Sequence, residues 1–194
     1  GLSPALQDFF DSVAQLAAKP SDLPSRQAMI STAEALSARY QSLGGQLAQM
    51  NDGINGEIKA SVADINSYAE QIASLNQQIG LAQVASGQPA NDLLDSRDQL
   101  ILELNRLIRT KTTSNSDGSV NVYIGSGQQL VVGSQAVALA AMSSAADPSR
   151  VVVALKSAAS TQEMPEKLLK GGALRGLLAF RSESLDRASR DLGR

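Results

Sequence analysis

Three acidic residues recur at every third position in the stretch NDLLDSRDQL, which covers residues 91–100. They are Asp92, Asp95 and Asp98, and Arg97 stands among them. On a helix, side chains three residues apart are neighbours, so these carboxylates could gather to hold a metal ion or to share a proton. The same acids would also suit the start of a helix, where the helix dipole favours negative charge.

The rest of the chain offers little to complete a catalytic or metal site. The 194 residues include no histidine and no cysteine. This excludes Ser–His–Asp triads, thiolate nucleophiles, disulfides and the usual zinc ligand sets. No second acidic cluster accompanies the first, so we predict no catalytic residue, no metal site and no cofactor. An enzyme that uses the acids at 92–98 remains an alternative.

We interpret the acidic stretch as a structural helix-start motif. In this interpretation Asn91 or Asp92 caps the helix, and the acids around Arg97 form ion pairs. Arg97 either pairs with Asp95 or Asp98 or reaches across to another domain. The motif consists of Asn91, Asp92, Leu93, Leu94, Asp95, Arg97 and Asp98.

Two further stretches resemble ligand-binding loops. Residues 115–121 read NSDGSVN and place oxygen ligands on alternate residues, but they lack the distal glutamate of a calcium loop. Asp117 and Gly118 instead predict a hairpin turn. Residues 125–127 read GSG, which is half of a dinucleotide fingerprint without the third glycine or the helix that should follow. We therefore interpret both stretches as turns.

Charge and hydropathy exclude two classes of partner. The chain carries 17 basic and 19 acidic residues, and aromatic residues make up 3% of it. Nucleic-acid-binding proteins usually show a basic stripe or stacking aromatics, so we predict no nucleic-acid partner. No apolar run approaches the roughly 18 residues of a membrane span, so we predict no membrane partner.

A long helix is the dominant predicted element. Apolar residues follow a 4-3-4-3 spacing from Met29 to Ile54, the pattern resumes from Ile58 to Ile79, and no proline interrupts it. The spacing predicts one helix over about 24–85, with roughly 60 residues and a length of roughly 90 Å, which is a rod. Its polar face is rich in Gln, Asn and Ser. Such a face suits packing against copies of itself, or it only confers solubility.

The apolar spacing of the long helix slips between Ile54 and Val62, and Gly53 and Gly56 lie at the slip. An extra four-residue step locally unwinds a coiled coil, and each glycine costs about 1 kcal/mol against alanine in a helix. The rod therefore bends at Gly53 and Gly56, or these glycines admit a close neighbour, or they are a tolerated weak spot.

The remaining periodicities predict an α+β fold. Helical spacing marks residues 3–19, 91–108 and 174–192, and alternating patterns predict short strands at 110–113, 120–124, 129–132, 137–139 and 151–155. We predict a long-helix bundle domain that is discontinuous in sequence, formed by residues 1–110 and 171–194. A small β-rich domain, residues 111–170, is inserted into it.

Five stretches of the sequence are distinctive when taken together. The most specific are NDLLDSRDQLILELNRLI (91–108) and GGALRGLLAFRSESLDRASRDLGR (171–194). Three others support them: FFDSVAQLAAKPSDLPSRQAMI (9–30), INSYAEQIASLNQQI (65–79) and DGSVNVYIGSGQQLVVG (117–133). Through these stretches the chain resembles, nearly end to end, the flagellar hook-associated protein 1 family, whose members join hook to filament.

The resemblance implies a structural, non-enzymatic protein of the bacterial flagellum. Family members form a thin ring between hook and filament, and they leave the cell unfolded through the flagellar type III export gate. The implied partners are the hook protein, the second hook–filament junction protein and further copies of the protein itself. An export chaperone would bind a C-terminal segment outside this chain. The family's terminal helical regions would also lie outside it, so we expect this core fragment to be a monomer.

Two other kinds of protein remain alternatives at this point. One is another axial or type III secreted coiled-coil protein, of the filament or needle-tip type. The other is an extracytoplasmic ligand-sensing domain with long helices, which would need a concave polar site.

Overall fold

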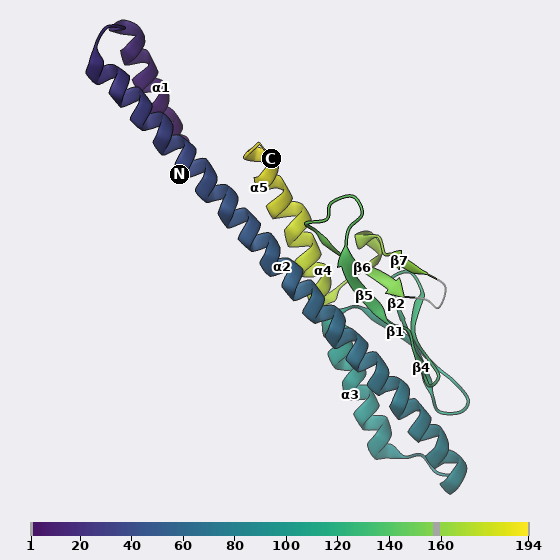
Figure 1. Ribbon diagram of the computed structural model, residues 1–194. Helices are drawn as coiled ribbons and strands as arrows, with labels where there is room; N and C mark the ends of the chain where they lie inside the picture. Colours follow the sequence, from purple (N-terminus) through teal and green to yellow (C-terminus); the bar gives the residue numbers. More distant parts are fainter. Residues whose placement is uncertain (1, 157–159, 194) are drawn as a thin grey trace. The chain divides into compact units, whose positions relative to one another are not determined.

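The computed structural model describes residues 2–156 and 160–193 (Figure 1). Backbone contacts divide the chain into two compact units. Unit one comprises Gly1–Asn51 and Ser184–Arg194, and unit two comprises Asp52–Glu183. No helix in the described ranges is both long enough and apolar enough to cross a membrane.

Two helices form most of unit one. Helix α1 (Leu2–Ala18) is followed by a short turn and by the first part of α2 (Leu23–Ser86). The carboxylate of Asp22 accepts a hydrogen bond from the Ser25 backbone N–H at 3.0 Å, which caps the start of α2. The hydroxyls of Ser12 and Thr32 lie 2.7 Å apart and join α1 to α2.

The predicted long helix corresponds to α2, which has 64 residues. It stays helical through Gly53 and Gly56. A Cβ added at either glycine would meet no other described atom within 4 Å. Within the described chain no neighbour approaches these glycines this closely, and a bend at this point stays a prediction.

Unit two contains two antiparallel sheets, and the strand over 120–124 follows the expected alternation, with its buried side chains at every second position. The first sheet has the order β1 (Thr110–Ser114), β2 (Val120–Ile124), β3 (Gln128–Val132) and β4 (Gln135–Ala136). The second has the order β5 (Leu139–Ser143), β6 (Val151–Lys156) and β7 (Thr161–Glu163). Long helices followed by two small antiparallel sheets confirm the predicted α+β class.

The predicted strand over 137–139 is wrong. The structure has β4 before this stretch and β5 beginning at its last residue, Leu139. Strand β5 reads LAAMS, and alanine has a low preference for strands, so nothing in its sequence marked it. Strand β7 is polar and exposed over Thr161–Glu163, and its sequence carries no apolar alternation either.

The core of unit two lies where α2, α3 (Asn91–Leu107) and the sheets meet. Each fully buried aliphatic side chain stabilises the fold by about 1.5–3 kcal/mol relative to exposure. The side chains with essentially no exposure include Ile58, Ile65, Ile72, Leu104, Ile108, Val122, Leu130, Leu174 and Leu178.

The last predicted helix is interrupted in the structure. A short 3₁₀ turn (Glu166–Leu168) leads to α4 (Gly172–Phe180), then to a π-helical segment (Arg181–Leu185) and to α5 (Asp186–Asp191). A π-helical turn inserts an extra residue into the helix and changes the direction of the side chain at that point. Arg181 begins this segment.

The predicted division into residues 1–110 with 171–194 and residues 111–170 stays a prediction. The two compact units follow other boundaries, because helix and sheet residues of 52–183 contact one another closely.

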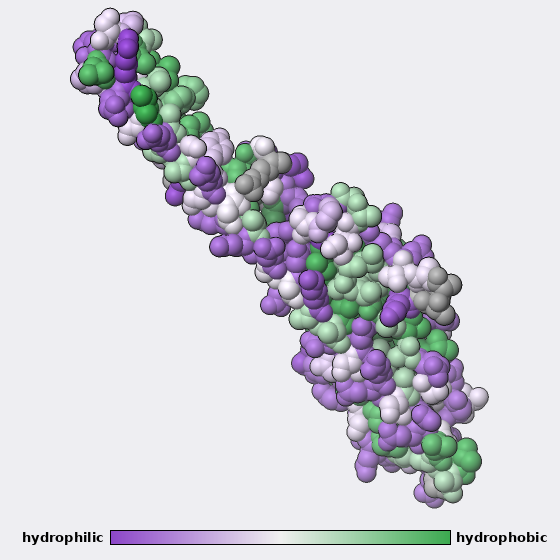
Figure 2. Space-filling view, in the orientation of Figure 1, coloured by the Kyte–Doolittle hydropathy of each residue, from purple (hydrophilic) through white to green (hydrophobic). Residues whose placement is uncertain are grey.

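On the viewed face, hydrophilic and hydrophobic residues are interspersed (Figure 2). Near the end of α2 in unit two, the exposed side chains include Leu81 and Val84.

Candidate functional site

Three asparagines on α2 bind the backbone of the sheets in unit two. Asn55, Asn66 and Asn76 each accept a hydrogen bond from the backbone N–H of the first residue of a strand. Those strand residues are Val151 of β6, Leu139 of β5 and Val120 of β2. An asparagine side chain offers one acceptor and one donor in the geometry of a peptide group, so it can act as a neighbouring strand.

Asn76 makes the most complete of these contacts. Its Oδ1 accepts the Val120 N–H at 3.1 Å, and its Nδ2 donates to the carbonyls of Val120 at 2.8 Å and Gly133 at 2.6 Å. The Asn76 side chain is buried, so loss of these bonds would leave polar groups unpaired in the core. Asn76 therefore ties β2 and the end of β3 to α2.

Arg97 completes the contact at Asn76. Its Nη1 donates to Asn76 Oδ1 at 3.2 Å and to the Gly118 carbonyl at 2.7 Å. The nearest Asp98 oxygen lies 4.0 Å from Arg97 Nε, at the limit of an ion pair. Burial lowers the pKa of Arg97, and the charge of Asp98 acts in the opposite direction. Arg97 thus reaches from its helix to the β1–β2 turn.

The predicted helix-start residues lie at the beginning of α3, but its cap differs from the prediction. Helix α3 starts at Asn91, and Ala90 occupies the cap position without a side-chain hydrogen bond. The expectation that Asn91 or Asp92 caps the helix is therefore wrong. Asp92, Asp95 and Asp98 are exposed, whereas Leu93 and Leu94 are half-buried. Within the described ranges, no group of three or more acidic residues could hold a metal ion.

The structure places Asp117 and Gly118 in the loop between β1 and β2. Gly118 has a φ of +79°, a conformation that favours glycine. A Cβ at this position would lie 2.7 Å from Gln83 Oε1, so the loop lies directly against α2. In this turn the Gly118 carbonyl accepts the hydrogen bond from Arg97, and a side chain at position 118 would meet Gln83.

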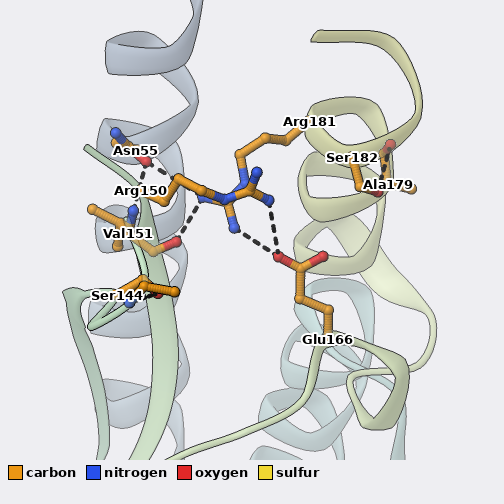
Figure 3. A network of polar contacts seen from close by, with 9 residues as sticks. Asn55, Ser144, Arg150, Val151, Glu166, Ala179, Arg181 and Ser182 are labelled. Carbon is orange, nitrogen blue, oxygen red and sulfur yellow. Dashed lines mark hydrogen bonds and ion pairs between the residues drawn. The ribbon is translucent and has the colours of Figure 1, made fainter. Parts of the chain in front are cut away.

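A second buried arginine makes the corresponding contact at Asn55 (Figure 3). Arg181 has no exposed surface, and its Nη1 donates to the Val151 carbonyl at 2.6 Å and to Asn55 Oδ1 at 3.4 Å. Asn55 Nδ2 donates to the Ser149 carbonyl at 2.8 Å. The start of β6 is therefore held by α2 and by the helical C-terminal segment at once.

Glu166 neutralises this second arginine. Its Oε1 lies 2.8 Å from Arg181 Nη2 and 3.8 Å from Arg150 Nη2 (Figure 3). Glu166 belongs to the 3₁₀ turn that precedes α4, so the ion pair links this turn to α4's C-terminal continuation. A buried charge needs such a partner, because an unpaired one costs several kcal/mol.

The same kind of turn precedes both of the strands that lie at these contacts, β2 and β6. Asp117 accepts hydrogen bonds from the Ser119 hydroxyl at 2.6 Å and its N–H at 2.9 Å, and Asp147 does the same with Ser149 at 2.6 and 3.0 Å. Hydrogen bonds from the serine side chain, and then from its backbone, hold the pKa of both aspartates below the usual range. One arrangement of turn, asparagine and arginine thus occurs twice in unit two.

The arrangement positions sheets on helices. The two arginines and their asparagines bind backbone atoms, and Arg97 Nε and Arg181 Nε have no hydrogen-bond partner among the described residues. The sequence did not mark Asn55, Asn66, Asn76 or Arg181. One signal was present, because Arg181 falls at helical spacing between Leu178 and Leu185, where an apolar residue is expected.

The chain matches known proteins along its whole length. The family model described as the flagellar hook-associated protein FlgK helical domain matches residues 1–194. Flagellar hook-associated protein 1 of Salmonella typhimurium is 44% identical over 194 residues, which are 99% of this chain and 35% of that protein. The protein of that name from Escherichia coli is 43% identical, covering 99% of this chain and 36% of that protein.

A solved structure has the same fold. The flagellar hook junction protein FlgK from Burkholderia pseudomallei aligns with a TM-score of 0.90 and 36% identity, covering 100% of this chain and 35% of that one. This chain therefore spans about a third of the length of the relatives it matches. Because a family model matches all of residues 1–194, the chain belongs to the flagellar hook-associated protein FlgK family.

Proposed function

We propose that this chain is part of a structural, non-enzymatic adaptor that joins the hook to the filament of the bacterial flagellum. The observation that carries the proposal is the TM-score of 0.90 with the flagellar hook junction protein FlgK over the whole chain. Identities of 43–44% with proteins named flagellar hook-associated protein 1 support it.

The adaptor acts mechanically in this proposal. Side chains on α2 and buried arginines bind the backbone of three strands, so a force on the sheets passes to the helices through hydrogen bonds. Such bonds resist displacement because each broken one leaves a buried polar group unpaired. The amide-rich face of α2 then packs against copies of the protein in an axial ring.

The proposed partners are the hook protein, the second hook–filament junction protein and copies of the same protein. Its location is outside the cell, at the hook–filament junction, after type III export with a chaperone. We further propose that residues 1–110 and 171–194 act as the helical domain and that residues 111–170 act as the inserted β-rich domain.

Deletion of the gene in the source bacterium tests the junction role. We expect cells with complete hooks but no attached filaments, with filament subunits lost to the medium, because nothing joins the two structures. The full-length gene supplied on a plasmid should restore filaments, as seen by electron microscopy. Filaments still attached to hooks in the deletion strain would contradict the proposal.

A further inference from the structure

Three of the six residues that line a small cavity in unit two are positively charged. Its volume is about 230 Å³. The charged members are Arg109, Lys111 and Lys170, and Tyr123 adds a hydroxyl. Thr110 and Gly125 complete the lining, and no acidic residue belongs to it.

The fold brings these residues together from three segments. Lys111 of β1 lies directly opposite Tyr123 of β2 in the antiparallel pair, so both side chains point to the same face. The Arg109 N–H donates to the Lys170 carbonyl at 3.0 Å, which joins the start of β1 to the segment before α4. A Cβ at Gly125 would lie 2.9 Å from the Leu168 carbonyl, so this segment also packs against the end of β2.

No nearby acid neutralises the cavity. Residues 104–116 and 118–146 contain no Asp or Glu. Asp117 lies in the turn at the other end of the β1–β2 hairpin, and Glu166 is engaged by Arg181. By contrast, Arg97, Arg106 and Arg181 each have an acidic neighbour, whereas no carboxylate of the described residues forms an ion pair with the three cavity cations.

We propose that this cavity binds a small oxyanion, either phosphate or a carboxylate. Converging cations repel one another, and an anion among them relieves that repulsion. The Arg109 guanidinium offers paired N–H donors, each lysine offers an ammonium group, and the Tyr123 hydroxyl can donate a further hydrogen bond. This binding role is independent of the proposed junction role.

Titration of the 194-residue chain with inorganic phosphate tests the site. The probe is a ¹H–¹⁵N spectrum recorded at constant ionic strength, with sodium chloride replacing phosphate in the reference. We expect saturable shifts of the Gly125 and Tyr123 amide signals, because both residues line the cavity. A parallel titration with acetate distinguishes the sources: tighter phosphate binding assigns a phosphate ligand, and tighter acetate binding assigns a carboxylate.

Charge-removing variants separate a built site from general attraction. Arg109→Gln, Lys111→Gln and Lys170→Gln should each weaken binding about tenfold, which corresponds to the loss of one charged hydrogen bond. All three residues are exposed, so the variants should fold. Lys59→Gln, an exposed lysine of α2 outside the cavity, is the control and should bind as the unmodified chain does. Shifts that do not saturate, or equal weakening by the control, would overturn the proposal.

Discussion

Arg97 and Arg181 occupy positions where the apolar stripe of a helix predicts a hydrophobic residue. Arg97 falls at helical spacing between Leu93 and Leu104, and Arg181 falls between Leu178 and Leu185. Both are buried, and each donates to a backbone carbonyl near the start of a strand: Arg97 to Gly118 in the loop before β2, and Arg181 to Val151, the first residue of β6. An arginine side chain is long and carries several donors, so it can form hydrogen bonds with a backbone that an aliphatic side chain would only cover. These two positions therefore gain directional hydrogen bonds in place of hydrophobic burial.

Substitution of a buried arginine should therefore cost far more than substitution of an exposed one. Arg181→Ala removes the arginine donor to the Val151 carbonyl and the nearer of the two cations at Glu166, so we expect the free energy of unfolding to fall by about 3–5 kcal/mol. Equilibrium denaturation in urea measures this loss.

Arg106→Ala provides the matched control. Arg106 pairs with Glu103 at 3.1 Å, but its side chain is 76% exposed, so the same substitution should cost at most about 1 kcal/mol. Similar losses for the two variants would contradict the role given to Arg181.

At this scale the sequence predicted turns better than contacts. The hairpin loop at Asp117 and Gly118 follows from local chemistry, because few residues adopt its backbone conformation. The hydrogen-bond partner of Arg97 does not follow from local chemistry. Its sequence neighbours Asp95 and Asp98 are exposed, and its contact lies across the fold at Gly118. Nothing local separates Asn76, which binds a strand, from the other amides of α2.

Helices and apolar strands are the elements that the sequence predicted well. The spacing of aliphatic residues gave α2 and α3 within a residue or two, alternation gave β2, and the apolar run over 151–155 gave β6. Strand β5 and the π-helical segment at Arg181 were not predictable in this way. Both depend on tertiary contacts: Asn66 fixes the start of β5, and the Val151 carbonyl and Glu166 hold Arg181.

A substitution at the start of α4 tests how closely this helix packs on α3. Gly172 has a φ of +73°, and a Cβ there would lie 2.4 Å from the Leu107 carbonyl oxygen. Backbone atoms cannot move aside as a side chain can, so Gly172→Ala should reduce the free energy of unfolding by about 2 kcal/mol or more. Thermal and urea denaturation both report it.

Gly176 supplies the control within the same helix. No other atom lies within 4 Å of a Cβ added there, and the residue is in the interior of α4. Gly176→Ala should therefore stabilise the chain by about 1 kcal/mol. Destabilisation by both variants to the same extent would mean that close packing at Gly172 is not the cause.

The hydrophobic core is distributed unevenly over the whole molecule. Among the described residues, the buried hydrophobic side chains belong to unit two, apart from Leu185. Unit one carries apolar side chains that remain largely exposed, such as Phe10 and Ile30. Local stability follows buried apolar contacts, so the two units should differ in how readily they open.

Hydrogen exchange measures this difference directly. Backbone amides of α1 and of the α2 segment before Asn51 should exchange much faster than those of the α2 segment over residues 58–79, although both are helical. Mass spectrometry of peptides from each segment gives the rates at one pH and temperature. Equal protection along the whole of α2 would contradict the expectation.

The asparagine contacts have a consequence for how the sequence can vary between species. Asn55, Asn66 and Asn76 bind main-chain N–H and carbonyl groups, which every residue except proline provides. The first residues of β2, β5 and β6 are therefore free to change among apolar types without loss of attachment. The three asparagines have no such freedom, since aspartate lacks the donor and leucine lacks both groups. Mutational drift should thus be tolerated on the strands and resisted on the helix.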